Sequence, residues 1–144
     1  MASLPQDYPG LRDIFDVHKS FGIIVLILVV LRILNRFKSN VPALPREVNK
    51  FYASLSAITI LALYVCMVCQ PIAGYFMSTF SGKAVTLFGL PIPSLVEKNA
   101  DMGKFFFEVH ASIGIALVVL ITLHIAGTVK HYAVDKVNLL KRMW

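Results

Sequence analysis

Charged residues are scarce in this sequence: Asp, Glu, Lys and Arg together make up 15% of its 144 residues, whereas a soluble domain carries about a quarter. Hydrophobic residues make up 57% of the chain, and its mean hydropathy is +0.71. This shortage of charge argues against an ordinary soluble domain and predicts a protein that is embedded in the lipid bilayer.

Motifs typical of several other protein classes are also lacking. The formal net charge is +6, but no basic patch is interleaved with aromatic residues, so we expect no nucleic-acid partner. The two cysteines, Cys66 and Cys69, lie in an apolar run. They are too few for a four-ligand zinc site and are interpreted as small hydrophobes. The sequence has no C-x-x-C-H motif for covalent haem attachment, no phosphate-cradling glycine loop and no nucleophile–base arrangement.

Long apolar stretches are what the sequence does contain. Residues 14–37, 53–77 and 105–129 are each long enough to span the bilayer core, which takes about 20 helical residues. We therefore expect an all-α membrane protein, with residues 1–144 forming one domain that has three transmembrane helices. Pro71 lies late in the second stretch and is expected to kink it, which a membrane helix tolerates where neighbours satisfy the freed carbonyl.

The distribution of basic residues predicts the topology. With three spans, the loop between the first two helices and the C-terminal tail lie on one side of the membrane. Excess Lys and Arg mark the cytoplasmic side, so this side, including the C-terminus, is predicted to be cytoplasmic. It holds nine of the 14 basic residues, namely Arg32, Arg36, Lys38, Arg46, Lys50, Lys130, Lys136, Lys141 and Arg142, against Arg12, Lys19, Lys83, Lys98 and Lys104 on the other.

Two histidines are expected at the same depth in the membrane. An ionisable residue inside a membrane helix is costly and by default marks function. His18 lies about one turn into the first predicted helix, and His110 about one turn into the third, which runs in the same direction. Two facing imidazoles at one depth can coordinate one iron from opposite sides. The sequence therefore predicts a haem near the outer face, with His18 and His110 as its metal ligands.

Both histidines begin the same pattern, H-x-S-x-G-I. Gly22 and Gly114 each follow their histidine by four residues and so lie on the same helix face. Without a side chain, each leaves room for a flat macrocycle against the backbone. The alternative is that these glycines mediate helix–helix packing, which is common in membranes.

His124 is the candidate ligand for a second haem. It lies on nearly the same helix face as His110, about 21 Å further along the axis and near the cytoplasmic side. At this level the first helix offers Arg32, which either snorkels toward the headgroups or lies near a haem propionate. No histidine of another helix reaches this depth, so the alternative for His124 is a hydrogen-bonded residue inside the bundle. His131 is interpreted as interfacial, with a role near quinone or in proton transfer as the alternative.

The sequence resembles the bacterial cytochrome b561 family. Besides the histidines, several short motifs match those of the family, and they occur in the same order along nearly the whole chain. These four-helix membrane cytochromes are grouped with the cytochrome subunits of nickel hydrogenases. The matching segments are His18-Lys19-Ser20-Phe21-Gly22, Leu31-Arg32-Ile33-Leu34-Asn35-Arg36, Pro42-Ala43-Leu44-Pro45, Gln70-Pro71-Ile72-Ala73-Gly74-Tyr75, Phe88-Gly89-Leu90-Pro91-Ile92-Pro93, His110, Leu123-His124-Ile125-Ala126, Lys130-His131-Tyr132 and Leu140-Lys141-Arg142-Met143.

The resemblance implies two non-covalent b haems and one-electron exchange with quinone in a respiratory chain of the bacterial inner (plasma) membrane. Carried over by position, His18 and His110 would ligate one haem and His124 the other. The family has a first helix before the segment that matches Leu4-Pro5, and the histidine of that helix partners the one at His124. The sequence as written starts after it, so we expect a truncated four-helix haem-binding bundle that holds one haem. A second haem would need a partner that supplies the missing helix, or a homodimer.

Two rival interpretations follow from the same sequence. The chain could be a non-catalytic membrane anchor subunit, or a degraded fragment that has lost haem. A haem spectrum separates the electron carrier from both rivals.

Overall fold

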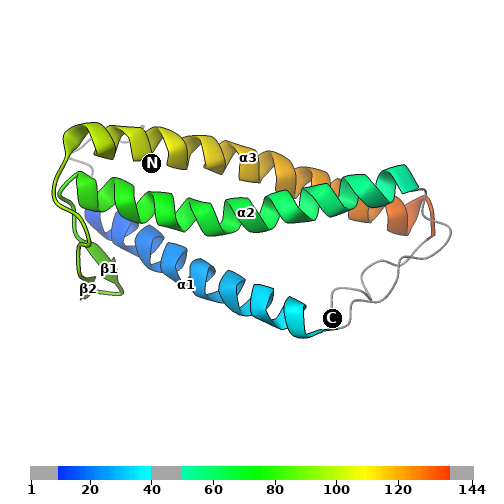
Figure 1. Ribbon diagram of the computed structural model, residues 1–144, viewed down its shortest axis with the longest axis horizontal. Helices are drawn as coiled ribbons and strands as arrows, with labels where there is room; N and C mark the ends of the chain where they lie inside the picture. Colours follow the sequence, from blue (N-terminus) through cyan, green and yellow to red (C-terminus); the bar gives the residue numbers. More distant parts are fainter. Residues whose placement is uncertain (1–9, 40–49, 137–144) are drawn as a thin grey trace.

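The computed structural model describes residues 10–39 and 50–136 (Figure 1). Several expected features lie outside the described residues. They are the segment that begins at Leu4-Pro5, the prolines Pro42 and Pro45, and the basic residues Arg46, Lys141 and Arg142.

Three long helices run through the described residues, and each is long and apolar enough to cross a membrane. They are α1 (Leu11–Lys38), α2 (Lys50–Phe80) and α3 (Ala100–Ala133). The expected helical fold class is thus confirmed. Each helix extends a few residues beyond the apolar stretch that predicted it, because hydropathy marks only the part inside the hydrocarbon while helical hydrogen bonding continues toward the headgroups. α2 runs through Pro71 without interruption.

The start of α3 is fixed by capping. The side chain of Asn99 accepts a hydrogen bond from the backbone N–H of Met102 at 3.1 Å, which satisfies one of the free donors of the first turn. Asp101 lies in that turn, and Lys130 and His131 lie in the last, so the charges at both ends complement the helix dipole.

A short β-hairpin joins α2 to α3. Its strands are β1 (Val85–Leu87) and β2 (Leu90–Ile92), which pair antiparallel with Leu87 opposite Leu90. The two turn residues, Phe88 and Gly89, both have positive φ, at 48° and 88°, as a two-residue type I′ turn requires. The hairpin is an addition to the expected all-α fold.

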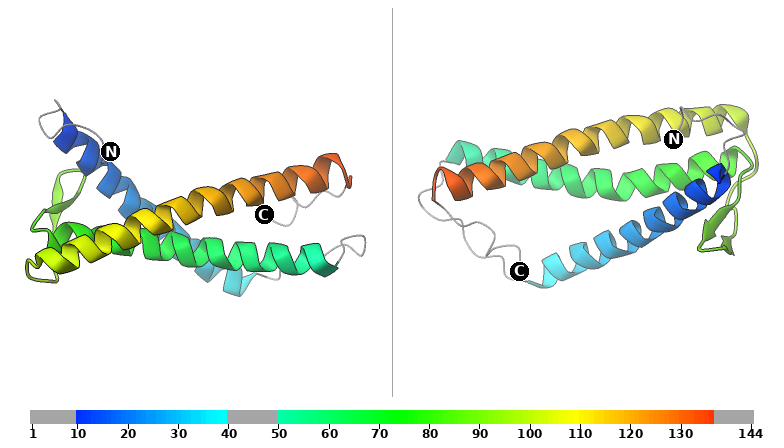
Figure 2. Two further views of the ribbon diagram at one scale, coloured as in Figure 1. Left: turned by 90° about the horizontal axis from the view of Figure 1, so that it is seen from above. Right: turned by 180° about the vertical axis from the view of Figure 1, so that it is seen from behind.

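The helices are arranged unevenly. α1 and α3 run in the same direction, with α2 returning between them in the chain (Figure 1). α2 and α3 share the most extensive contact of any two elements, and Gly103 lets them approach closely, since a Cβ there would lie 2.8 Å from Ser81 Oγ. α1 packs on α2 and β1, and it diverges from the other two helices toward its Lys38 end (Figures 1 and 2).

Apolar side chains cover the outside of the bundle. Among the described residues, the buried hydrophobic side chains are few and include Val29, Leu63 and Ala73, whereas many large ones on all three helices are exposed. In a bilayer such faces contact lipid or other helices. The surface therefore agrees with a bundle that lies in a membrane.

Candidate functional site

His18 of α1 and His110 of α3 lie face to edge at the end of the bundle that carries the hairpin. Their ring centroids are 6.1 Å apart, and the ring planes are nearly perpendicular, at 87°. The two side chains, predicted to lie at one depth, therefore lie side by side at the same end of the bundle. The contact bridges α1 and α3, although α1 packs mainly on α2 and β1.

The two imidazoles differ in their surroundings. His110 is half-buried, and its Nδ1 lies 2.9 Å from the backbone carbonyl oxygen of Gln70 in α2. A carbonyl oxygen only accepts hydrogen bonds, so Nδ1 carries the proton and donates it. Nε2 then carries the lone pair, which accepts a hydrogen bond from the side-chain amide of Gln70 at 3.3 Å. His18 is exposed on α1, and no described residue hydrogen-bonds its ring.

The two glycines of the repeated pattern have different neighbours. A Cβ at Gly22 would meet nothing within 4 Å, whereas one at Gly114 would lie 3.3 Å from Gln70 Nε2. Gly22 therefore leaves open space beside His18, as the prediction of a macrocycle requires. Gly114 instead makes room for a side chain of α2, which agrees with the helix-packing alternative.

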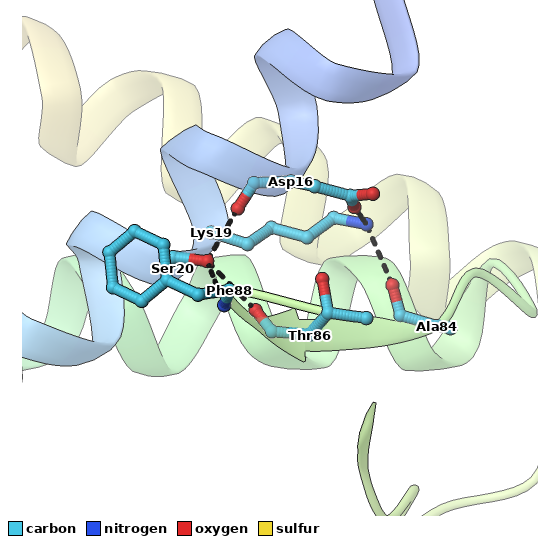
Figure 3. A network of polar contacts seen from close by, with 6 residues as sticks. All are labelled: Asp16, Lys19, Ser20, Ala84, Thr86 and Phe88. Carbon is cyan, nitrogen blue, oxygen red and sulfur yellow. Dashed lines mark hydrogen bonds and ion pairs between the residues drawn. The ribbon is translucent and has the colours of Figure 1, made fainter. Parts of the chain in front are cut away.

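The serine of the same pattern anchors the hairpin to α1. Ser20 is fully buried, donates a hydrogen bond to the Asp16 carbonyl at 2.7 Å and accepts one from the N–H of Phe88 at 2.8 Å (Figure 3). Next to it, Lys19 Nζ donates to the Ala84 carbonyl at 2.7 Å and lies 3.6 Å from Asp16 Oδ1. The two residues that follow His18 thus hold the hairpin segment against α1.

His124 and Arg32 are not brought together by the described contacts. His124 is half-buried in α3, and its imidazole has no hydrogen-bond or ring partner among the described residues. Arg32 is exposed on the half of α1 that diverges from the other helices (Figure 1). No described group of three or more His, Cys, Asp or Glu side chains could hold a metal ion. The assignment of His124 and Arg32 to a second haem therefore stays a prediction.

His131 takes part in a polar cluster at the opposite end of the bundle. Its Nδ1 lies 2.7 Å from Asp135 Oδ2, which also accepts a hydrogen bond from Lys130 Nζ at 2.8 Å. Lys130 Nζ lies 4.4 Å from the ring centroid of Tyr52 at the start of α2. The cluster therefore ties the end of α3 to the beginning of α2.

Sequence reasoning gave no role to Gln70 or Ser20, although both lie in segments that carry the family resemblance. Gln70 precedes Pro71 within an apolar helix, where an amide is rare, and this polar exception was the available signal. Ser20 lies inside the repeated pattern, but its twin in α3, Ser112, is exposed. The pattern alone therefore could not show which serine is structural.

The histidine pair at the hairpin end has the spacing that a haem with two histidine ligands would need. Metal–imidazole bonds of about 2 Å place the ring centroids of two ligands on opposite sides of one iron about 6 Å apart. His18 and His110 already have this separation. The proton on His110 Nδ1 leaves Nε2 as the nitrogen that would bind iron, in place of its contact with the Gln70 amide. The hydrogen bond of Nδ1 is of the kind that orients metal ligands.

Comparison with known proteins agrees with this geometry. Residues 1–144 match the family described as prokaryotic cytochrome b561. The chain is 30% identical over 129 residues to cytochrome b561 homolog 2 of Escherichia coli (strain K12), covering 89% of this chain and 69% of that protein. It is also 26% identical over 127 residues to a Yersinia pestis protein named probable superoxide oxidase CybB, covering 88% of this chain and 72% of the relative. Because the family match extends over the whole chain, this protein belongs to the prokaryotic cytochrome b561 family.

Proposed function

We propose that this chain binds one haem b between His18 and His110 and carries single electrons in the membrane. The observation that supports this most directly is the 6.1 Å separation of the two perpendicular imidazole rings. These rings come from two different helices, and a ring pair of this kind inside apolar spans is otherwise costly. Membership of a cytochrome family supports the cofactor.

The chain's own residues would hold and enclose the group. His110 is oriented by the Gln70 carbonyl, and His18 is placed by the turn of α1 that Ser20 and Lys19 tie to the hairpin. The open space at Gly22 would leave room for a flat ring. When bound, the haem would supply one-electron exchange.

Quinone is the proposed redox partner, and the bacterial inner membrane is the proposed location. Both come from the family resemblance, and the three long apolar helices support a place in the membrane. The proposed orientation, with the C-terminus in the cytoplasm, rests on the excess of basic residues at the Lys38 end of α1 and beyond α3.

The test is a haem spectrum of the purified 144-residue chain. The wild type should show a reduced b-type spectrum with low-spin iron. His18→Ala and His110→Ala should each abolish the low-spin signal, because one strong axial ligand is lost. His131→Ala is the matched control, since His131 contacts Asp135 at the other end of the bundle, and it should keep the spectrum.

Two outcomes would reject the proposal. If both site variants keep a normal low-spin spectrum, the ligand pair is wrong. If the well-folded wild type binds no haem, the chain is not the proposed electron carrier, and the two haem-free interpretations, anchor subunit and degraded fragment, are left. Once haem is bound, reoxidation of the reduced chain by a short-chain quinone tests the redox partner separately, and failure to react would exclude quinone.

A further inference from the structure

Gly74 of α2 lies directly against the imidazole of His110. A Cβ at this position would lie 2.9 Å from His110 Cε1 and 3.1 Å from Nδ1. The first of these separations is shorter than real Cβ contacts allow. The imidazole therefore occupies the space that any other residue at position 74 would fill.

This close approach allows one particular hydrogen bond. Gln70 precedes Gly74 by one helical turn, and its carbonyl oxygen accepts the proton of His110 Nδ1 at 2.9 Å. A side chain on residue 74 would push the ring away from α2 and lengthen this bond. Because hydrogen bonds weaken steeply beyond about 3.2 Å, even a small displacement would remove most of it.

We propose that Gly74 is a positioning residue, which lets the backbone carbonyl of Gln70 fix the tautomer and orientation of His110. The carbonyl selects the form protonated at Nδ1, so that Nε2 is the nitrogen that binds iron. Neither residue touches the iron, and both act through His110. This inference rests on the proposed function, since it assigns these residues to the same haem.

The experiment compares Gly74→Ala with Gly127→Ala in the full-length, haem-loaded chain. Gly127 also lies in a membrane helix, but a Cβ there would meet nothing within 4 Å. Alanine is a better helix former than glycine by about 1 kcal/mol, so neither change should unfold its helix, which circular dichroism checks. Affinity for haem should fall in Gly74→Ala by about 10- to 100-fold, as is usual when a ligand loses its orienting partner. Gly127→Ala should match the wild type.

The midpoint potential gives a readout that a merely structural role would not move. A hydrogen bond from Nδ1–H to a carbonyl raises the basicity of the ligand and favours ferric iron. The potential of the haem that remains in Gly74→Ala should therefore rise, while that of Gly127→Ala stays at the wild-type value. Equal affinity and equal potential in all three proteins would overturn the inference.

A measurement on the wild type covers the case in which Gly74→Ala does not fold. Nitrogen-15 NMR of the reduced, histidine-labelled chain should show His110 protonated and hydrogen-bonded at Nδ1. A ring that carries its proton on Nε2 and binds iron through Nδ1 would refute the inference. Loss of the haem itself from the wild type would instead reject the proposed function, so the two failures can be told apart.

Discussion

Ser20 shows how much the surroundings of a single residue decide its role. Ser20 and Ser112 occupy the same place in the pattern H-x-S-x-G-I, but Ser20 is fully buried and Ser112 is exposed. The hydroxyl of Ser20 accepts the N–H of Phe88, and the ring of Phe88 packs edge-on against Phe21 at 6.1 Å. One side chain thus connects α1 to the turn of the hairpin.

We expect Ser20→Ala to loosen the hairpin. The change leaves the N–H of Phe88 without its acceptor, and the loss of such a hydrogen bond costs about 0.5–1.5 kcal/mol. Hydrogen exchange of the Phe88 amide should therefore accelerate, and proteolysis between β1 and β2 should become faster. Ser112→Ala is the matched control and should leave both rates unchanged. Equal protection of Phe88 in the wild type and Ser20→Ala would show that the hydroxyl does not anchor the turn.

The closeness of His18 and His110 could be predicted from the sequence, whereas the groups that surround His110 could not. His18 and His110 could be matched because helix periodicity and span length fix their depth. The contact of His110 with the Gln70 carbonyl could not be foreseen, since it depends on the rotation of α2 about its axis. That rotation follows from packing between helices, which the sequence of one helix does not specify.

At the scale of secondary-structure elements, the end of α3 is held by charge. Lys130, and in addition His131, hydrogen-bond the carboxylate of Asp135 just beyond the helix. The hydrogen bond from Lys130 lowers the pKa of Asp135 below its ordinary value, and the one from His131 acts in the same direction. Ionised Asp135 therefore favours the folded end of the helix.

The sign of this effect predicts how the helix end responds to acid. A carboxylate with a lowered pKa contributes stability above its unfolded value of about 3.9, and loses it as the pH falls through the folded pKa. The backbone N–H groups of Val134 and Asp135 both donate to the Lys130 carbonyl. These two amides should be protected from hydrogen exchange at neutral pH and should lose that protection below about pH 4.

Asp135→Asn should remove this dependence on acid. In that variant, the protection factors of the two amides should already be lower at neutral pH and should change little on acidification. Asp101→Asn, at the opposite end of α3, is the control and should behave like the wild type at Val134. An unaltered acid response in Asp135→Asn would assign the effect to another group.

The helices could be predicted closely, whereas the hairpin could not. A long apolar stretch in lipid has few alternatives to a helix, because each backbone group must be satisfied within the segment. The hairpin consists of strands of three residues each, too short for a periodic pattern. Gly89 with positive φ was its strongest local signal, but Phe88, which also has positive φ, is not a residue that favours such a turn.

At the scale of the whole molecule, we expect at most one bis-histidine haem per chain. Of the four histidines in the sequence, His18 and His110 are proposed to ligate the same haem. No described residue contacts the imidazole of His124 as a partner. Haem quantified per polypeptide of the 144-residue chain should therefore not exceed one low-spin haem. Supplying in trans an apolar helix that carries a histidine should raise the content toward two. Two low-spin haems in a monomer of the chain alone would contradict this prediction.

The topology provides a second test on the whole molecule. The basic residues at the Lys38 end of α1 and beyond α3 predict that this side faces the cytoplasm. A reporter fused after Trp144 should therefore read as cytoplasmic, and one inserted near Lys98, between the hairpin and α3, as external. The opposite pattern in both fusions would reverse the orientation of the bundle.

The depth of His110 has an electrical consequence. Glu108 and Lys130 bracket the uncharged stretch of α3 at residues 109–129, which spans about 30 Å, the thickness of the hydrocarbon core. His110 lies at its very beginning. A charge that crosses the whole membrane gains or loses about 2.3 kcal/mol per 100 mV, but an electron that arrives from the hairpin side and stops at His110 crosses only a small share of that field. Reduction of a haem held at this level is therefore almost insensitive to the transmembrane voltage.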